Sequence, residues 1–226
     1  LYAIGDTHLS ESVNKPMDIF GGAWDNYREK LLKGLSCLQE EDLLVIAGDF
    51  SWGMSLKEAL ADFKLISSFP GKKVFLKGNH DYWWKSSSRL EARYPGMRFL
   101  KNDFDTYEGW AVCGTRGWLC PNDVRFTEQD KKIYEREQVR LRLSLDAAMR
   151  KGAEKIVLMM HYPPMNDKKE DSAFTELFRE YPIKKVVYGH LHGEASHATG
   201  FEGERNGIEY ELVAADYIDF CPKRIL

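Results

Sequence analysis

The sequence predicts an α/β protein whose central strands are mainly parallel. Two observations lead to this fold class. Short apolar runs of the length of a buried strand recur along the chain, and amphipathic helical patterns lie between several of them. The strand-like runs are residues 1–4, 43–47, 73–77, 110–113, 156–160 and 185–188.

Helices are predicted where apolar residues recur every three or four positions. One such pattern runs from Trp24 to Leu38 and a second from Leu56 to Ile66. Thr127, followed three residues later by Asp130, marks the expected start of a third helix. The apolar positions expected on that helix are Ile133, Val139, Leu143 and Leu145.

The C-terminal part has a different pattern. Residues 208–214 and 218–226 resemble two strands with no helix between them, and we expect them to pair antiparallel. Residues 102–108 and 166–172 are polar and are expected to be surface loops. Because there is no internal repeat and no Gly/Ser-rich linker, residues 1–226 are expected to form a single domain.

Composition excludes several classes of protein. The 226 residues include 32 Lys and Arg against 35 Asp and Glu, a balance that argues against a dedicated nucleic-acid binder. No apolar run approaches the ~18 residues of a membrane span, and the first residues lack the pattern of a signal peptide. We therefore expect a cytoplasmic protein without a membrane partner. Its cysteines form no Cys-x-x-Cys pair and are expected to be reduced thiols; they are Cys37, Cys113, Cys120 and Cys221.

Polar residues follow five of the predicted strands. The segments are Gly5-Asp6-Thr7-His8, Gly48-Asp49, Gly78-Asn79-His80-Asp81, His161 and Gly189-His190-Leu191-His192. The carboxyl ends of parallel strands share one edge of a sheet, and ligands bind at that edge. We therefore expect these segments to converge in space, bringing five of the six histidines together.

Such a cluster has the chemistry of a metal site. Imidazoles and carboxylates without thiolates suit a borderline divalent ion such as Mn²⁺, Fe²⁺ or Zn²⁺, and the imidazole content is too high for a Ca²⁺ or Mg²⁺ site. There are more candidate ligands than the three that one catalytic ion usually takes, which favours two ions. The alternative interpretation, separate strand caps and core histidines, would serve for a single histidine but not for all five.

The order of these blocks resembles the calcineurin-like metallophosphoesterase superfamily, and the resemblance extends from Asp6 to His192. It implies a four-layer α/β/β/α sandwich of two mixed sheets with a two-metal site at the strand ends. It also implies a role for each residue: Asp6, His8 and His192 on the first ion, Asn79, His161 and His190 on the second, Asp49 bridging both, His80 facing the substrate, and Asp81 hydrogen-bonded to His80.

The chemistry that the resemblance implies follows from charge. Two divalent ions carry +4, whereas Asp6 and Asp49 supply only −2, so the site should attract a bridging hydroxide and an anionic phosphate ester. Mn²⁺ is the expected ion, with Fe or Zn as alternatives. His80 would stabilise the departing oxygen or donate a proton to it.

Other residues have two interpretations each. The family usually has arginine where this chain has Trp52, and an indole cannot supply that charge; Trp52 either lines the substrate cleft or packs. Arg116 is expected to bind a substrate phosphate through two hydrogen bonds, the alternative being a surface salt bridge. Tyr82, Trp83 and Trp84 form either a wall of the cleft or part of the core. His197 is expected at the surface.

The resulting prediction is a binuclear-metal hydrolase of phosphate esters, either a phosphodiesterase or a phosphomonoesterase, acting on a small phosphate ester or a nucleotide. One alternative is a non-catalytic metal-binding scaffold of the same fold used for protein contacts. Another is a metal-dependent hydrolase of a different bond, such as an amide. The sequence does not specify an oligomeric state.

Overall fold

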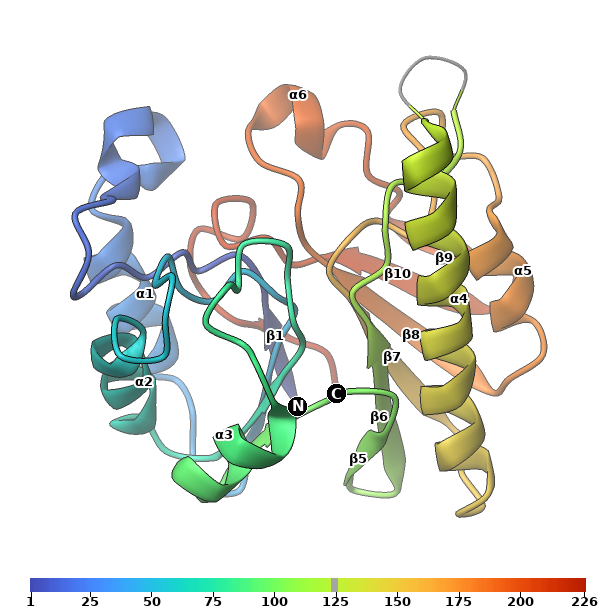
Figure 1. Cartoon of the computed structure of the whole chain (residues 1–226), viewed down its shortest axis with the longest axis horizontal. Helices are drawn as coiled ribbons and strands as arrows, with labels where there is room; N and C mark the ends of the chain where they lie inside the picture. Colours follow the sequence, from blue (N-terminus) through green and yellow to red (C-terminus); the bar gives the residue numbers. More distant parts are fainter. Residues whose placement is uncertain (123–125) are drawn as a thin grey trace.

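Two mixed β-sheets pack face to face in the computed structural model, with helices on both outer sides (Figure 1). The structure describes residues 1–122 and 126–226. In Figure 1, α1, α2 and α3 lie on one side of the molecule and α4 and α5 on the other. This arrangement confirms the expected α/β fold of two mixed sheets.

Each sheet has a parallel centre. In the first, order β11-β1-β2-β3-β4, the strands are β1 (Tyr2–Ile4), β2 (Leu43–Ile46), β3 (Lys72–Phe75), β4 (Met97–Phe99) and the antiparallel edge β11 (Lys223–Arg224). In the second, order β5-β6-β7-β8-β10-β9, they are β5 (Phe104–Tyr107), β6 (Trp110–Thr115), β7 (Ile156–Met160), β8 (Ile183–Tyr188), β10 (Ile208–Leu212) and β9 (Gly203–Arg205). There β6, β7, β8 and β10 are parallel, and both edges are antiparallel.

Helices α1, α2 and α3 cover the outer face of the first sheet, and α4 and α5 cover that of the second. They are α1 (Tyr27–Leu35), α2 (Leu60–Ser67), α3 (Ser87–Arg93), α4 (Glu128–Met149), α5 (Ala173–Phe178) and α6 (Glu194–His197), with two 3₁₀ turns, η1 (Met17–Phe20) and η2 (Gly22–Trp24). Within the described ranges, no helix is both long and apolar enough to cross a bilayer.

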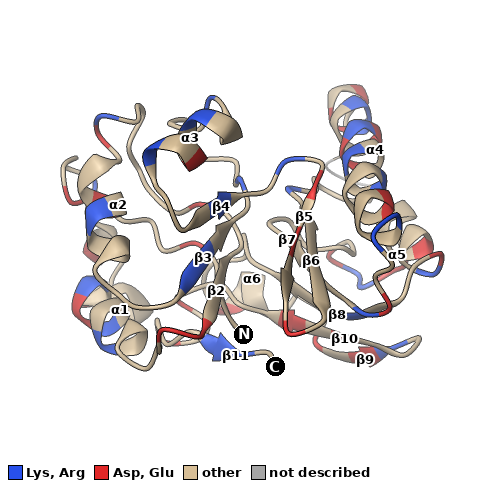
Figure 2. Cartoon of the chain, turned by 90° about the horizontal axis from the view of Figure 1, so that it is seen from below, with Lys and Arg blue, Asp and Glu red and all other residues tan. Residues whose placement is uncertain are grey.

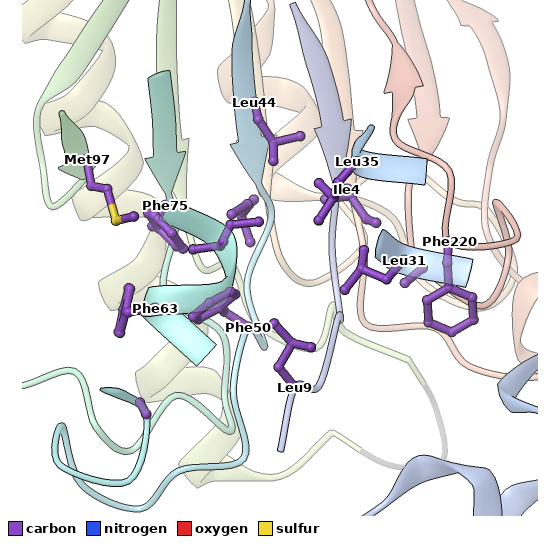
Figure 3. Packing of buried hydrophobic residues seen from close by; sticks show 14 of the residues in the cluster. Ile4, Leu9, Leu31, Leu35, Leu44, Phe50, Phe63, Phe75, Met97 and Phe220 are labelled. Carbon is purple, nitrogen blue, oxygen red and sulfur yellow. The ribbon is translucent and has the colours of Figure 1, made fainter. Parts of the chain in front are cut away.

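Successive side chains of a strand point to opposite faces of its sheet, so each sheet packs on both sides. This gives three apolar clusters, one between the sheets and one on each outer face. Val45 and Val74 meet Val157 and Val187 between the sheets. On the outer face of the first sheet, Ile4, Leu44 and Phe75 pack with Leu31, Leu35 and Phe63 of the helices (Figure 3). A third cluster joins the second sheet to α4 and α5.

All six strand-like runs of the sequence are strands here. The start of the third helix is also confirmed, since Thr127 and Asp130 cap α4 reciprocally. The Asp130 backbone N–H donates to Thr127 Oγ1 at 3.2 Å, and the Thr127 N–H donates to Asp130 Oδ2 at 2.9 Å. Residues 166–172 contain no helix or strand, as predicted.

The prediction for the C-terminal strands is wrong. They lie in different sheets: β10 pairs in parallel with β8, and β11 pairs antiparallel with β1. The chain crosses between the sheets just after β10, where Gly5 bonds to Val213 and Ala215. The prediction of a surface loop over residues 102–108 is also wrong, because they contain the strand β5. Its polarity reflects its place at the edge of a sheet.

The predicted apolar face of α4 is partly wrong. Val139 and Leu143 are 61% and 44% exposed, whereas Tyr134, Leu141 and Leu145 are buried. Because α4 packs against the second sheet through the latter three, Val139 and Leu143 fall on its outer side.

The four cysteines differ in reactivity, which can be tested. All are free; Cys37 and Cys221 are exposed, whereas Cys113 and Cys120 are buried. Burial raises the pKa of Cys113 and of Cys120 to about 12. Because the thiolate is the nucleophile, iodoacetamide at pH 8 should modify Cys37 and Cys221 of the native protein, and the buried pair only in denaturant. Peptide mass spectrometry measures this; equal labelling of Cys113 in both states would contradict the buried position.

Candidate metal centre

The segments that follow β1, β2, β3, β7 and β8 converge, as the sequence predicts. The Asp6 backbone N–H donates to the Gly48 carbonyl at 2.8 Å, and the Gly189 N–H donates to the His161 carbonyl at 3.1 Å. The strands come from two sheets rather than one. The polar residues nevertheless meet because the carboxyl ends of both parallel sets lie at the same side of the molecule.

Unusual backbone conformations aim the side chains into this junction. Asp6, His8, Asp49 and His190 all have positive φ, between 45° and 71°, a region that non-glycine residues rarely occupy. Such strain often collects at functional sites. Gly189 permits the close approach, because a Cβ there would overlap Asp6 Oδ2.

The first group that could hold a cation consists of Asp6, His8 and His192. His192 Nε2 lies 3.3 Å from His8 Nε2 and 3.5 Å from Asp6 Oδ1. His192 Nδ1 donates to Asp216 Oδ1 at 3.0 Å, so Nε2 is the nitrogen that faces the group.

The second group consists of Asp6, Asp49 and His161. His161 Nδ1 donates to the Ala47 carbonyl at 3.0 Å, which leaves Nε2 unprotonated. That Nε2 lies 2.6 Å from Asn79 Oδ1 and 3.4 Å from Asp49 Oδ2. The sequence-predicted residues Asn79, Asp49 and His161 are thus brought together.

Asp49 lies between the two groups, whereas His190 is at their edge. Asp49 Oδ2 is 3.9 Å from His8 Nε2 as well as 3.4 Å from His161 Nε2. The His190 ring lies 5.0 Å from the His161 ring and packs on Tyr162, with 3.9 Å between centroids. Its backbone N–H donates to Asp6 Oδ2 at 2.8 Å.

These donor atoms fit divalent cations. Asp6 Oδ1 is buried and accepts no hydrogen bond from any described residue, although a buried carboxylate oxygen is costly to leave without a partner. Burial lowers the pKa of His161 and of His190 to about 3, and that of His8 well below its usual value, so all three rings are neutral. Neutral imidazoles and carboxylates are the ligands that borderline divalent ions take.

The pKa shifts of Asp49 and His192 also indicate a site suited to cations. Burial, with Asp81 and Asp6 close by, raises the pKa of Asp49 well above its usual value. Burial alone would lower the pKa of His192, but the Asp216 and Asp6 carboxylates outweigh it and raise that pKa to about 10. Crowded carboxylates and an imidazolium stabilised by its carboxylate neighbours are features of a site suited to positive charge.

The expected hydrogen bond between His80 and Asp81 is wrong, whereas the contact of His80 with a substrate stays a prediction. The His80 ring faces the cavity described below, 4.7 Å from the Trp52 ring. Both Asp81 oxygens are buried and bonded elsewhere. They accept backbone N–H groups of Gly78, Asp49 and Phe50 at 2.7–3.0 Å and the indole N–H of Trp83 at 3.1 Å. Asp81 therefore holds the loops that carry Asp49 and Asn79, and it does not orient His80.

His197 is also corrected, and Asp216 is a residue that the sequence analysis missed. The His197 side chain is only 13% exposed, and its Nε2 lies 3.2 Å from Asp216 Oδ2. Asp216 accepts the His192 Nδ1–H and, at 3.0 Å, the Gly193 backbone N–H. It follows β10 at the same carboxyl edge as the other site residues, a signal that the wrong antiparallel assignment of that strand concealed.

A model of the calcineurin-like phosphoesterase family matches residues 1–194. The chain belongs to this family. No curated protein matches the chain. Among solved structures, the chain is similar to the protein of unknown function AQ665 from Aquifex aeolicus, with a TM-score of 0.48 and 16% identity over 98% of this chain and 93% of that one.

Trp52, which this chain has in place of the family arginine, lines the site. Its ring stacks on His8 with 4.6 Å between centroids, and its indole N–H points to Met17 Sδ at 3.3 Å. Of the other aromatic candidates, Trp83 and Trp84 are buried in the core, and Tyr82 is half exposed.

Arg116 does not line the cavity over the candidate metal centre. Its guanidinium lies over the Trp118 ring at 4.6 Å, and its Nη2 is 3.4 Å from Glu137 Oε1. The expected contact with substrate at the metal centre is therefore not supported, and the salt-bridge alternative holds. Its partner, however, is a buried carboxylate rather than a surface one.

A cavity of about 1180 Å³ opens over the metal centre. Its floor includes His8, Asp49, His80, His190 and His192. Apolar side chains form much of its walls: Met17, Phe20, Trp24, Trp52 and Tyr217. Its lining residues include those of η1, η2 and the segment that contains α6. These segments lie at the same end of the molecule (Figure 1). Its volume exceeds what a phosphate group alone requires.

Proposed function

We propose that this protein hydrolyses small phosphate esters with two divalent metal ions, of which Mn²⁺ is the first to test. The observation that carries the proposal is the gathering of free carboxylate and imidazole donor atoms around Asp6 Oδ1, at the floor of a cavity that His80 also faces. When bound, two such ions would neutralise phosphate charge and make hydroxide available near neutral pH.

Each residue of the candidate metal centre would have a separate role. Asp6, His8 and His192 would hold one ion, Asn79, His161 and His190 the other, and Asp49 would contact both. Asp216 and the Ala47 carbonyl fix which nitrogen of His192 and His161 faces the ions. His80 would donate a hydrogen bond or a proton to the departing oxygen.

The cavity suggests the kind of substrate. Beside the metal centre, the partly exposed Trp52 and the 41% exposed Tyr217 line the cavity and present aromatic surface to which an aryl group or a nucleobase could stack. A small phosphate ester or a nucleotide therefore suits the cavity. Monoester or diester preference, the identity of the metal, a cytoplasmic location and the single-domain organisation stay predictions.

Hydrolysis of bis-p-nitrophenyl phosphate with added Mn²⁺ tests the proposal. We expect turnover by the wild-type protein and none above background from Asp49→Asn, because the substitution removes a charge shared by both metal groups. Metal content after dialysis gives a second readout: two ions per chain in the wild type and fewer in the variant. Circular dichroism checks that the variant is folded.

Other outcomes separate the alternatives. Turnover of p-nitrophenyl phosphate alone would identify a monoesterase. Two bound ions without hydrolysis of either ester would contradict the proposal and favour the scaffold. Hydrolysis of an amide substrate but of no phosphate ester would move the protein to another class of metal hydrolase.

A further inference from the structure

A second cavity, of about 310 Å³, lies at the seam between the two sheets. Its lining comes from the ends of three strands, the loop before α3 and helix α4. The residues are Leu76 and Lys77 after β3, Trp84 and Lys85 of the loop, Leu100–Asn102 after β4, Gly114–Arg116 at the end of β6, and Arg136, Glu137 and Arg140 of α4. It shares no lining residue with the cavity over the metal centre.

The charge of this second cavity is strongly one-sided. Six cationic side chains and one carboxylate line it, whereas the whole chain carries a formal charge of −3. The cations are Lys77, Lys85, Lys101, Arg116, Arg136 and Arg140. Figure 2 shows Lys and Arg positions on α4 and on the segment that leads into β5, on either side of the seam. A cleft lined by positive charge raises the local concentration of anions.

The single carboxylate is already used to position two arginines. Glu137 is 1% exposed, and its Oε1 accepts from Arg140 Nη1 at 2.7 Å and lies 3.4 Å from Arg116 Nη2. Its Oε2 accepts the Thr115 hydroxyl at 2.8 Å. Arg116 Nε is inaccessible to solvent and has no hydrogen-bond partner among the described residues. Glu137 and Trp118 thus hold two guanidinium groups in place at the edge of the cavity.

The remaining cations have no carboxylate partner. None of the ion pairs in the described parts of the chain includes Lys77, Lys85, Lys101 or Arg136. Arg142, elsewhere on α4, does have a carboxylate partner. That residue makes two hydrogen bonds to the Glu180 carboxylate, at 2.7 and 3.0 Å. The cations around the cavity repel one another and would be stabilised by an anion among them.

We propose that this second cavity binds a compact polyanion that carries at least two linked phosphate groups. Guanidinium forks match phosphate oxygens, and several cations favour an ion of high charge over a singly charged one. The volume is at the lower end of the range for ligand pockets, which suits a pyrophosphate group rather than a large molecule.

The proposed ligand would lie next to two segments of the metal centre. Lys77 immediately precedes Gly78-Asn79-His80, and the Arg116 carbonyl accepts the backbone N–H groups of His161 and Tyr162 at 3.2 and 2.9 Å. The proposal does not depend on catalysis, because binding can be measured on metal-free protein, whether or not the protein hydrolyses esters.

Calorimetric titration of the metal-free protein with pyrophosphate, in EDTA and at low ionic strength, is the test. We expect one site per chain, weakened by added salt and binding orthophosphate less tightly. The double variant Lys101→Gln/Arg136→Gln should bind at least about tenfold more weakly, since it loses two charge-assisted contacts. Neither side chain has an ion-pair partner among residues 1–122 and 126–226, so folding should be unaffected.

Two controls locate the site. Arg142→Gln removes a cation elsewhere on α4 and should leave the affinity unchanged. Asp49→Asn alters the metal centre and should also leave it unchanged. The proposal is overturned if the wild type does not bind, if Arg142→Gln weakens binding as much as the double variant does, or if only Asp49→Asn affects it.

Discussion

Replacing His80 with alanine should lower kcat for phosphate ester hydrolysis by about 10²- to 10⁴-fold while both metal ions stay bound. The His80 ring faces the cavity beside the metal groups, 5.9 Å from the His8 ring, but belongs to neither group. Burial lowers the pKa of His80, so the free protein holds a neutral ring whose N–H can donate to the departing oxygen. Steady-state kinetics and metal content measure the two effects separately.

A neighbouring residue provides the control. Tyr82 is half exposed and its ring lies 6.2 Å from His80, so Tyr82→Ala changes the same loop without removing the imidazole. Its kcat should stay within a few-fold of the wild type. Wild-type turnover by His80→Ala, with two ions bound, would contradict the role of His80. Loss of an ion from that variant would instead make His80 part of the metal centre.

Much of the site could be predicted because its residues follow strands that the sequence marks clearly. The runs before Asp49 and His161 are fully apolar and buried, and the run before Asp6 is buried except at Tyr2, so their ends could be placed to within one or two residues. Parallel strands bring their carboxyl ends together, which predicts convergence from local information alone. Gly48, with φ of 93°, marks one of the sharp turns that follow.

The parts that could not be predicted depend on contacts between distant segments. The sequence suggests a hydrogen bond between Asp81 and its chain neighbour His80. In the structure the Asp81 carboxylate accepts four N–H groups of other residues instead. His197 belongs to no motif, and only folding brings it to Asp216. The short edge strands β5 and β9 have no apolar face long enough to show a periodic pattern.

Replacing Asp216 with asparagine should weaken metal binding at the first group by about 10- to 100-fold, the usual effect of losing a carboxylate that orients a histidine ligand. Asp216 Oδ1 accepts the His192 Nδ1–H at 3.0 Å and so directs Nε2 toward His8 and Asp6. Asparagine keeps the shape but removes the charge. Titration of metal-free protein with Mn²⁺ should show one weakened site and one that is nearly unchanged.

Graded variants distinguish positioning from folding. His197→Ala removes a neighbour of Asp216 but leaves the Asp216–His192 hydrogen bond, so it should weaken the first site less than Asp216→Asn does. Asp219→Asn, at a side chain that is 81% exposed, should have no effect on either site. If Asp216→Asn lowers the Tm of metal-free protein strongly and reduces both metal affinities equally, Asp216 acts through stability. If Tm is kept and only the first site weakens, Asp216 acts by holding His192 in the tautomer that leaves Nε2 free for the ion.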